Sequence, residues 1–181
     1  MKGAERGMSM QSRSRKPPNR IVLAALLTGL ALALSLVDTA VSAAIPFLPG
    51  FKLGIANIVT MFALYYLGFR EALVINVIRC LLSALLSGFV TMLFFSIAGA
   101  LLSLVVMALL MNRISRIKVS VTGGIAHNMA QAAVAAALTA TPQVSYYIPF
   151  LVISGAISGF FIGLLCSLLM QRLHAGENKS L

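Results

Sequence analysis

From Ile21 to Ala44 the sequence is apolar or small at nearly every position, and Asp38 is the one charged side chain in the run. At about 1.5 Å per residue, a helix of this length crosses a hydrocarbon core of about 30 Å. Composition agrees, because 60% of the 181 residues are hydrophobic and 10% are charged, whereas an ordinary soluble domain has about 25% charged residues. The sequence therefore predicts a membrane protein and excludes an ordinary water-soluble fold.

Five further apolar runs follow, so the sequence predicts an all-α fold built as a bundle of six transmembrane helices. The predicted spans are 21–44, 53–69, 72–87, 89–111, 119–140 and 147–170. Residues 1–20 are polar and basic without apolar periodicity, which predicts a disordered cytoplasmic tail. Residues 171–181 are predicted to form a second cytoplasmic tail.

The charges test this count of helices. The net charge is +10, but the basic residues lie at the ends of apolar runs and not in one patch, which favours membrane lipid over nucleic acid as the anionic neighbour. Six spans bring nearly all of these residues to one side of the membrane: Arg13, Arg15, Lys16, Arg20, Arg70, Arg113, Arg116, Lys118, Arg172 and Lys179. The connections on the opposite side offer only Lys52. The positive-inside rule then predicts a multi-pass protein of the cell membrane with both termini in the cytoplasm.

A secretory signal peptide is the competing interpretation of the N-terminus, with Val41-Ser42-Ala43 as its cleavage site. It is disfavoured because the apolar run is long for a signal peptide. Removing that run would also leave five spans and place the basic C-terminus opposite the basic fourth connection.

Small residues at a spacing of four form two rows that predict close helix contacts. Gly155, Gly159 and Gly163 form one row in the sixth span, where packing inside the bundle is the favoured interpretation. A second row in the first span consists of Ala25, Gly29 and Ala33. For this row, internal packing and docking to a separate protein are about equally supported.

Polar side chains inside the predicted spans are the candidates for function, because burying them in lipid is costly. Asp38 and Arg79 lie at comparable depths, so we expect both to face the bundle interior. A direct or water-mediated pair between them is an open interpretation, and so is a purely structural role for that pair. His127 and Gln131 share one face of the fifth span, and Asn128 lies on a neighbouring face. Hydrogen bonding between helices and the lining of a binding cavity are both open interpretations of this polar stripe.

Lys52 and Asn57 complete the predicted substrate-binding set, which is Asp38, Lys52, Asn57, Arg79, His127, Asn128 and Gln131. A connection rich in Pro and Gly precedes Lys52 and includes Pro49, Gly50 and Phe51. It is interpreted either as a lid over the site or as an ordinary turn with a lysine that reaches toward the membrane surface.

Two motifs resemble a known family. They are PGFKLGIANIVTMFAL, from Pro49 to Leu64, and GGIAHNMAQ, from Gly123 to Gln131, with the arginine of the third span between them. They are similar to the Gx transporter family, whose members are often catalogued as heptaprenyl diphosphate synthase component I. The resemblance covers about 21–170, and it extends to the substrate-binding S-components of energy-coupling-factor importers.

This resemblance implies a six-helix subunit that captures a small molecule outside the cell, while a separate membrane scaffold and ATPases supply the energy. It implies that the first-span row of small residues contacts the scaffold, and that the connection containing Pro49 to Lys52 closes over the substrate. A small anionic or amphipathic molecule, vitamin-like or isoprenoid-like, is the expected cargo.

Catalysis is not expected. Prenyl diphosphate synthesis needs clustered carboxylates that hold magnesium, and the sequence contains one Asp and three Glu without such a cluster. Cys80 and Cys166 have no partners at metal-ligand spacing, so neither a metal nor another cofactor is predicted. Three classes remain: a transport subunit as the favoured one, a noncatalytic membrane component associated with prenyl diphosphate or quinone and redox metabolism, and a membrane enzyme as the least supported.

Overall fold

A computed structural model describes residues 19–43, 54–88, 90–139 and 142–177, and every regular element in these ranges is helical. The elements are α1 (Arg20–Ala43), α2 (Asn57–Tyr66), α3 (Phe69–Ser87), α4 (Val90–Leu110), α5 (Arg116–Thr139), the short 3-10 helix η1 (Pro142–Tyr147) and α6 (Ile148–Glu177). The all-α fold and the six helices therefore agree with the sequence prediction. The turn η1 was not predicted.

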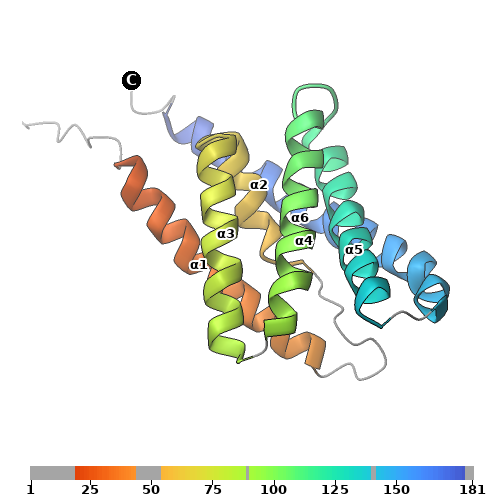
Figure 1. Cartoon of the computed structure of the whole chain (residues 1–181). Helices are drawn as coiled ribbons and strands as arrows, with labels where there is room; N and C mark the ends of the chain where they lie inside the picture. Colours follow the sequence, from red (N-terminus) through yellow and green to blue (C-terminus); the bar gives the residue numbers. More distant parts are fainter. Residues whose placement is uncertain (1–18, 44–53, 89, 140–141, 178–181) are drawn as a thin grey trace, which may run out of the picture.

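The helices form one bundle in which consecutive helices run in opposite directions (Figure 1). α3 packs against α1 and α4, and α5 packs against α4 and α6. The short α2 contacts α1, α3, α4 and α6, so it lies at the centre of the bundle. The apolar core contains Leu64 of α2, Ile75 of α3, Leu104 of α4 and Val119 of α5, all nearly inaccessible to solvent.

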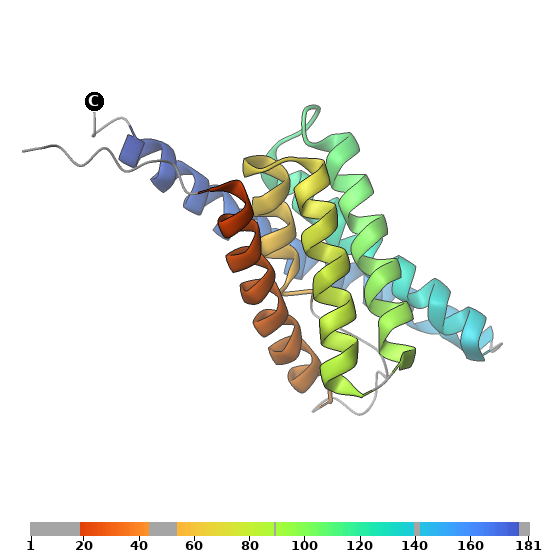
Figure 2. The ribbon, with the colours of Figure 1, turned by 60° about the vertical axis from the view of Figure 1, so that its left-hand side comes forward.

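The two ends of the bundle differ in charge. The start of α1, the turn between α2 and α3, the connection between α4 and α5, and the end of α6 all lie at the same end of the molecule (Figure 2). Basic residues gather there, and in the described residues they are Arg20, Arg70, Arg113, Arg116, Lys118 and Arg172. We refer to this end as the basic end.

Three segments are long and apolar enough to cross a membrane, namely Arg20–Val41, Val90–Leu110 and Ser145–Leu173. α3 and α5 have comparable lengths but contain more polar and charged residues. α2 has only 10 residues, which corresponds to about 15 Å, or half of the hydrocarbon thickness. The structure thus supports a membrane protein, in which three of the six helices satisfy the criteria for a span on their own.

Glycines explain why α2 is shorter than the predicted span 53–69. Gly54 has a φ of +75° and is followed by a turn, so the helix begins at Asn57. Gly68 has a φ of +112° and separates α2 from α3 directly after Leu67. Residues with side chains rarely adopt such angles, and glycine adopts them freely.

The end of α6 also differs from the prediction. The helix continues to Glu177, whereas the sequence placed the end of the span at Met170 and a tail from 171 onward. Leu173 belongs to the same apolar segment as the rest of α6. A basic residue inside the last turns, Arg172, is compatible with a helix that extends beyond the hydrocarbon region.

Candidate binding site

Six buried polar side chains lie at the contacts between α1, α2 and α3. Each helix provides two of them at a spacing of three residues, which places each pair on one helix face. The pairs are Ser35 and Asp38 on α1, Asn57 and Thr60 on α2, and Asn76 and Arg79 on α3. All six are at most 5% exposed. We refer to these residues as the polar cluster.

Both terminal nitrogens of the Arg79 guanidinium donate hydrogen bonds. Nη1 donates to Ser35 Oγ at 2.7 Å, and Nη2 donates to Asn76 Oδ1 at 3.0 Å. Asn76 Oδ1 also accepts a hydrogen bond from Thr60 Oγ1 at 2.9 Å. These bonds connect α1, α2 and α3 through one cation, and they fix the position of the charge.

Asp38 lies one turn beyond Ser35 on α1 and connects α1 to the start of α2. Its Oδ2 accepts a hydrogen bond from the backbone N–H of Gly54 at 2.9 Å. A backbone group at this buried position requires a partner, since an unpaired one is costly. Asp38 and Arg79 both face the interior of the bundle, as their burial shows.

His127 extends the polar region from the cluster to α4 and α5. Its imidazole lies against Gly99 of α4, where an added Cβ would be 2.7 Å from Cε1. The same ring approaches Gly54, since a Cβ there would be 4.0 Å from His127 Cδ2 and 3.1 Å from Asn57 Nδ2. The structure therefore brings Asp38, Asn57 and His127 to the surroundings of Gly54.

Gln131 lies one turn beyond His127 on α5. It is 4% exposed, and within the described part of the chain neither Nε2 nor Oε1 has a hydrogen-bond partner. Along the contact between α4 and α5, Gly99 lies against His127, and Ser103 lies near Gly123. One helical turn further along this antiparallel pair, Gln131 is at the level of Ser96. Gln131 therefore belongs to the same face of α5 as His127.

Several atoms of the polar cluster also lack partners in the described ranges. They are Arg79 Nε, Asn76 Nδ2 and Asn57 Oδ1. Buried polar groups in folded proteins are nearly always hydrogen-bonded, to protein or to ordered water. Together with Gln131, these atoms offer both donors and acceptors to a molecule that enters the bundle.

Asn128 has a different environment from the other predicted binding residues. Its Nδ2 donates to the carbonyl oxygen of Leu151 at 2.8 Å and to Ser154 Oγ at 3.2 Å, both on α6. Successive residues on a helix point about 100° apart, so Asn128 faces α6 while His127 faces α4. The structure does not bring Asn128 into the polar cluster.

The glycine row of α6 faces α5. A Cβ on Gly155 would be 2.7 Å from the Gly124 carbonyl oxygen, and one on Gly159 would be 2.6 Å from the Ser120 carbonyl oxygen. Gly163 lies against Ile117 in the same way. We refer to this contact of backbone against backbone as the glycine seam.

The small-residue row of α1 has the opposite environment. Ala25, Gly29 and Ala33 are all exposed, and a Cβ on Gly29 would have no atom within 4 Å. This row therefore does not pack against any of the described helices. Lys52 and the predicted lid residues Pro49, Gly50 and Phe51 lie outside the described residues.

Sequence reasoning missed Ser35, Thr60 and Asn76, and also the two glycines that contact His127 and Asn57. A signal was present, because each missed polar residue lies three positions from a residue that the sequence did indicate, Asp38, Asn57 or Arg79.

No group of three or more His, Cys, Asp or Glu side chains suited to a metal ion occurs in the described ranges.

These features define the class of protein, an all-α membrane protein with a polar cluster buried in its helix bundle. The chain belongs to the family described as heptaprenyl diphosphate synthase component I, whose model matches residues 27–169. This match confirms the family indicated by the two sequence motifs. No curated protein and no solved structure matches the chain.

Proposed function

We propose that this chain is the substrate-binding membrane subunit of an importer of the energy-coupling-factor type. The observation that supports the proposal best is the set of unpartnered polar atoms on Arg79, Asn76, Asn57 and Gln131, all in side chains at most 5% exposed. Each unpaired buried group costs about 1–3 kcal/mol. A cluster that served only to join helices would be expected to satisfy its own members, whereas a binding site keeps atoms available for its ligand.

Within the cluster the Asp38 carboxylate is bonded to the Gly54 N–H, so the guanidinium of Arg79 is the charged group that favours an anionic or amphipathic molecule. Arg79 places a cation among α1, α2 and α3 and retains an unpartnered Nε. Hydrogen bonds from a buried guanidinium to an anionic group are among the stronger polar contacts in proteins. Apolar residues of the bundle would hold the remainder of a vitamin-like or isoprenoid-like molecule.

The proposed topology has six membrane-crossing helices and both termini in the cytoplasm. The location of basic residues at one end of the bundle supports this orientation. The exposed row of Ala25, Gly29 and Ala33 on α1 offers a smooth surface to a membrane scaffold subunit, which would connect the chain to ATPases. Differential binding in outward and inward states would then release the substrate to the cytoplasm.

A second function is favoured by the family description, which names one component of a heptaprenyl diphosphate synthase. In this alternative the chain is a noncatalytic membrane component that holds a prenyl diphosphate or a quinone precursor for a separate enzyme. Arg79 would again face the anionic group. The two functions differ in their partners, a scaffold with ATPases in the first and a prenyltransferase in the second.

Ligand retention tests the proposed site. The protein is purified in mild detergent from its native membrane, and the bound small molecule is identified by native and denaturing mass spectrometry. We expect the wild type to retain an anionic or amphipathic molecule. Arg79→Gln and Gln131→Leu should each retain at least about tenfold less of it, since a hydrogen bond to a charged group contributes about 1.5–3 kcal/mol. Proteins recovered with the chain distinguish the two functions.

Leu109→Ala is the matched control, because Leu109 is 68% exposed on α4 and lies outside the cluster. All variants have to reach the membrane at the wild-type level for the comparison to hold. Equal retention in wild type, Arg79→Gln and Gln131→Leu would contradict the assignment of the polar cluster as the binding site.

A further inference from the structure

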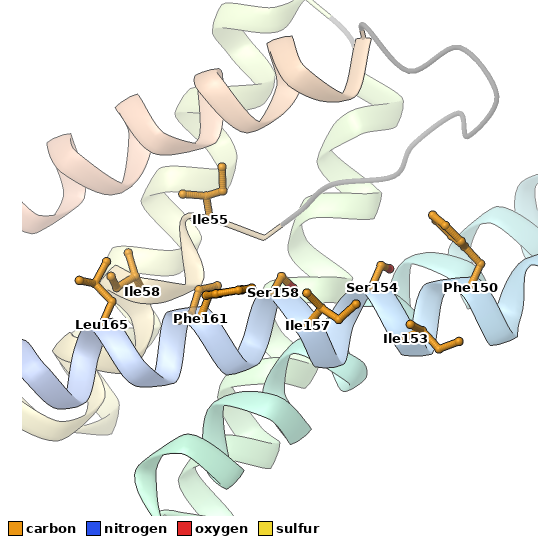
Figure 3. A pocket seen from close by; sticks show the side chains of 10 residues that line it. Ile55, Ile58, Phe150, Ile153, Ser154, Ile157, Ser158, Phe161 and Leu165 are labelled. Atoms are coloured by element: carbon orange, nitrogen blue, oxygen red, sulfur yellow. The ribbon is translucent and has the colours of Figure 1, made fainter.

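An apolar groove lies between α2 and α6, separate from the polar cluster. Its volume is about 630 Å³, within the range of about 300–1,000 Å³ that is common for ligand sites. Ile55 and Ile58 form the wall from the α2 side, and residues from Phe150 to Leu165 form the wall from α6 (Figure 3). Along α6 these residues extend over about 22 Å.

The described residues that line the groove are almost all apolar, and none of them is charged. Two of these described lining residues, Ser154 and Ser158, have polar side chains. Ser154 Oγ donates to the Leu151 carbonyl oxygen at 3.1 Å, and Ser158 Oγ donates to the Gly155 carbonyl oxygen at 3.3 Å. A molecule held here is therefore a hydrocarbon over the length of the groove, because any polar group on it would be left unpaired.

A cation, Arg116, lies near the level at which the groove ends toward the basic end. On the α2 side, Tyr65 lies two turns beyond Ile58, and the Arg116 guanidinium carbon lies 5.5 Å from the centre of the Tyr65 ring. On the face of α6 that packs against α5, Gly163 contacts Ile117, the residue after Arg116, so Arg116 lies at nearly the same level along α6 as the last groove residue, Leu165. Arg116 therefore lies beside Tyr65, at the level along α6 where the groove ends.

We propose that the α2–α6 groove binds one hydrocarbon chain of an anionic phospholipid from the leaflet at the basic end, with the lipid phosphate at Arg116. The dimensions agree, since one leaflet contributes about 15 Å of hydrocarbon and the groove is longer. The charges agree as well, because guanidinium groups pair with phosphate oxygens and basic residues attract anionic lipids at membrane surfaces. This proposal does not depend on the substrate or on the transport function.

The sequence makes a direct test possible, because the chain contains no Trp. Ile157→Trp places a fluorescent reporter on the groove, and Val105→Trp places one on the lipid-exposed side of α4; Ile157 is 54% exposed and Val105 43% exposed. The two sites have similar depths, because Gly123 contacts Ser103 of α4 and Gly124 contacts Gly155 of α6. Each variant is reconstituted in phosphatidylcholine vesicles with a rising fraction of brominated phosphatidylglycerol.

We expect half-maximal quenching at the groove reporter at a brominated phosphatidylglycerol fraction about fivefold lower than at the α4 reporter. Brominated phosphatidylcholine is expected to quench both reporters equally. Arg116→Gln should remove the preference, and Arg116→Lys should retain part of it. Arg113→Gln removes the same charge from an exposed position at the same end and should leave the preference unchanged.

Three outcomes would overturn the proposal. Equal quenching of both reporters by both lipids would show that only bulk lipid covers the groove. A preference that persists in Arg116→Gln would show that the phosphate binds elsewhere. A groove reporter shielded from both lipids by a protein that is recovered with the chain would assign the groove to a protein partner.

Discussion

At the scale of single residues, two amides on α5 illustrate two different roles of polar groups in this bundle. The side chain of Asn128 donates to Leu151 and Ser154 on α6. The side chain of Gln131, nearly one turn further on, has no hydrogen-bond partner among the described residues. The first amide connects two helices, and the second is one of the groups that we propose to bind a ligand.

This difference predicts opposite effects on stability. Asn128→Leu should destabilise the protein by about 0.6 kcal/mol and at most about 1.7 kcal/mol, the range measured for hydrogen bonds between membrane helices. Gln131→Leu should leave the ligand-free protein equally or more stable, because it removes an unpaired buried group. Thermal unfolding in detergent, without added ligand, provides the measurement. A larger loss of stability in Gln131→Leu than in Asn128→Leu would contradict the assignment of the two roles.

Gly99 gives a second prediction at this scale. An added methyl group would be 2.7 Å from His127 Cε1, a contact that the ring has to relieve by moving. Gly99→Ala should therefore destabilise the protein by about 1–3 kcal/mol and displace the imidazole from the surroundings of Gly54. Thermal unfolding measures the first effect, and ligand retention measures the second.

Gly29→Ala is the control for this substitution, because a Cβ on Gly29 has open space around it. Alanine is favoured over glycine in a helix by up to about 1 kcal/mol, so this variant should be as stable as the wild type or more stable. Equal unfolding temperatures for Gly99→Ala and Gly29→Ala would show that His127 does not pack against α4 as described.

At the scale of helices, α5 and α6 approach each other most closely. Along the glycine seam the backbone of one helix contacts the backbone of the other, at Gly155 with Gly124 and at Gly159 with Ser120. Lipid tails are as apolar as leucine side chains, so close packing of this kind supplies much of the attraction between membrane helices. We therefore expect the seam to contribute more to the stability of the α5–α6 contact than the hydrogen bonds of Asn128.

Gly159→Ala tests the seam. Its methyl group would be 2.6 Å from the Ser120 carbonyl oxygen and 2.8 Å from Val121 Cα, and neither backbone atom can move away independently. We expect a loss of at least about 2 kcal/mol, within the range for overpacking and above the loss in Asn128→Leu. Thermal unfolding of the two variants under identical conditions makes the comparison, and the reverse order would show that the seam is not the principal contact.

The exposed row on α1 predicts that a bulky substitution there weakens assembly with a partner without changing the stability of the isolated subunit. Gly29→Leu adds a large side chain where no atom of the described residues lies within 4 Å of an added Cβ, so the isolated subunit should unfold at the wild-type temperature. Recovery of a membrane scaffold with the chain should fall strongly, because the smooth surface is lost. Leu30→Ala, a change at an exposed neighbouring position, is the control. Full recovery of the partner with Gly29→Leu would show that this row is not part of the interface.

At the scale of the whole molecule, the basic end predicts the orientation in the membrane. The connection between α4 and α5 contains Asn112 and Arg113 and lies at the basic end, while Thr91 lies at the opposite end of α4. The two native cysteines, Cys80 and Cys166, are buried. A single introduced cysteine therefore reports on its own position.

Labelling of intact cells with a membrane-impermeant maleimide tests this orientation. We expect Thr91→Cys to react from outside, and Asn112→Cys to react only after the membrane is permeabilised. Wild-type protein is the control and should remain unlabelled, since both of its thiols are buried. Reaction of Asn112→Cys in intact cells would reverse the proposed topology.

The fold was predictable from sequence where apolar runs are long, as in α1, α4 and α6, because the number of residues needed to cross lipid is fixed by geometry. It was less predictable for α2, whose bounds depend on positive φ angles at Gly54 and Gly68 that hydropathy does not reveal. Arg79 and Asp38 stood out as charges in apolar surroundings. Ser35 and Thr60 did not, because hydroxyl side chains in membrane helices commonly bond to their own helix backbone.

The glycine seam has a consequence for how the molecule changes shape. Along the seam few side chains lie between the two helices whose rotamers could switch, so a sliding step between α5 and α6 would break many contacts at once. They are expected to travel as a single rigid unit. Rearrangement that opens a path for a solute would then fall to the half-length α2, which is held against its neighbours by fewer turns.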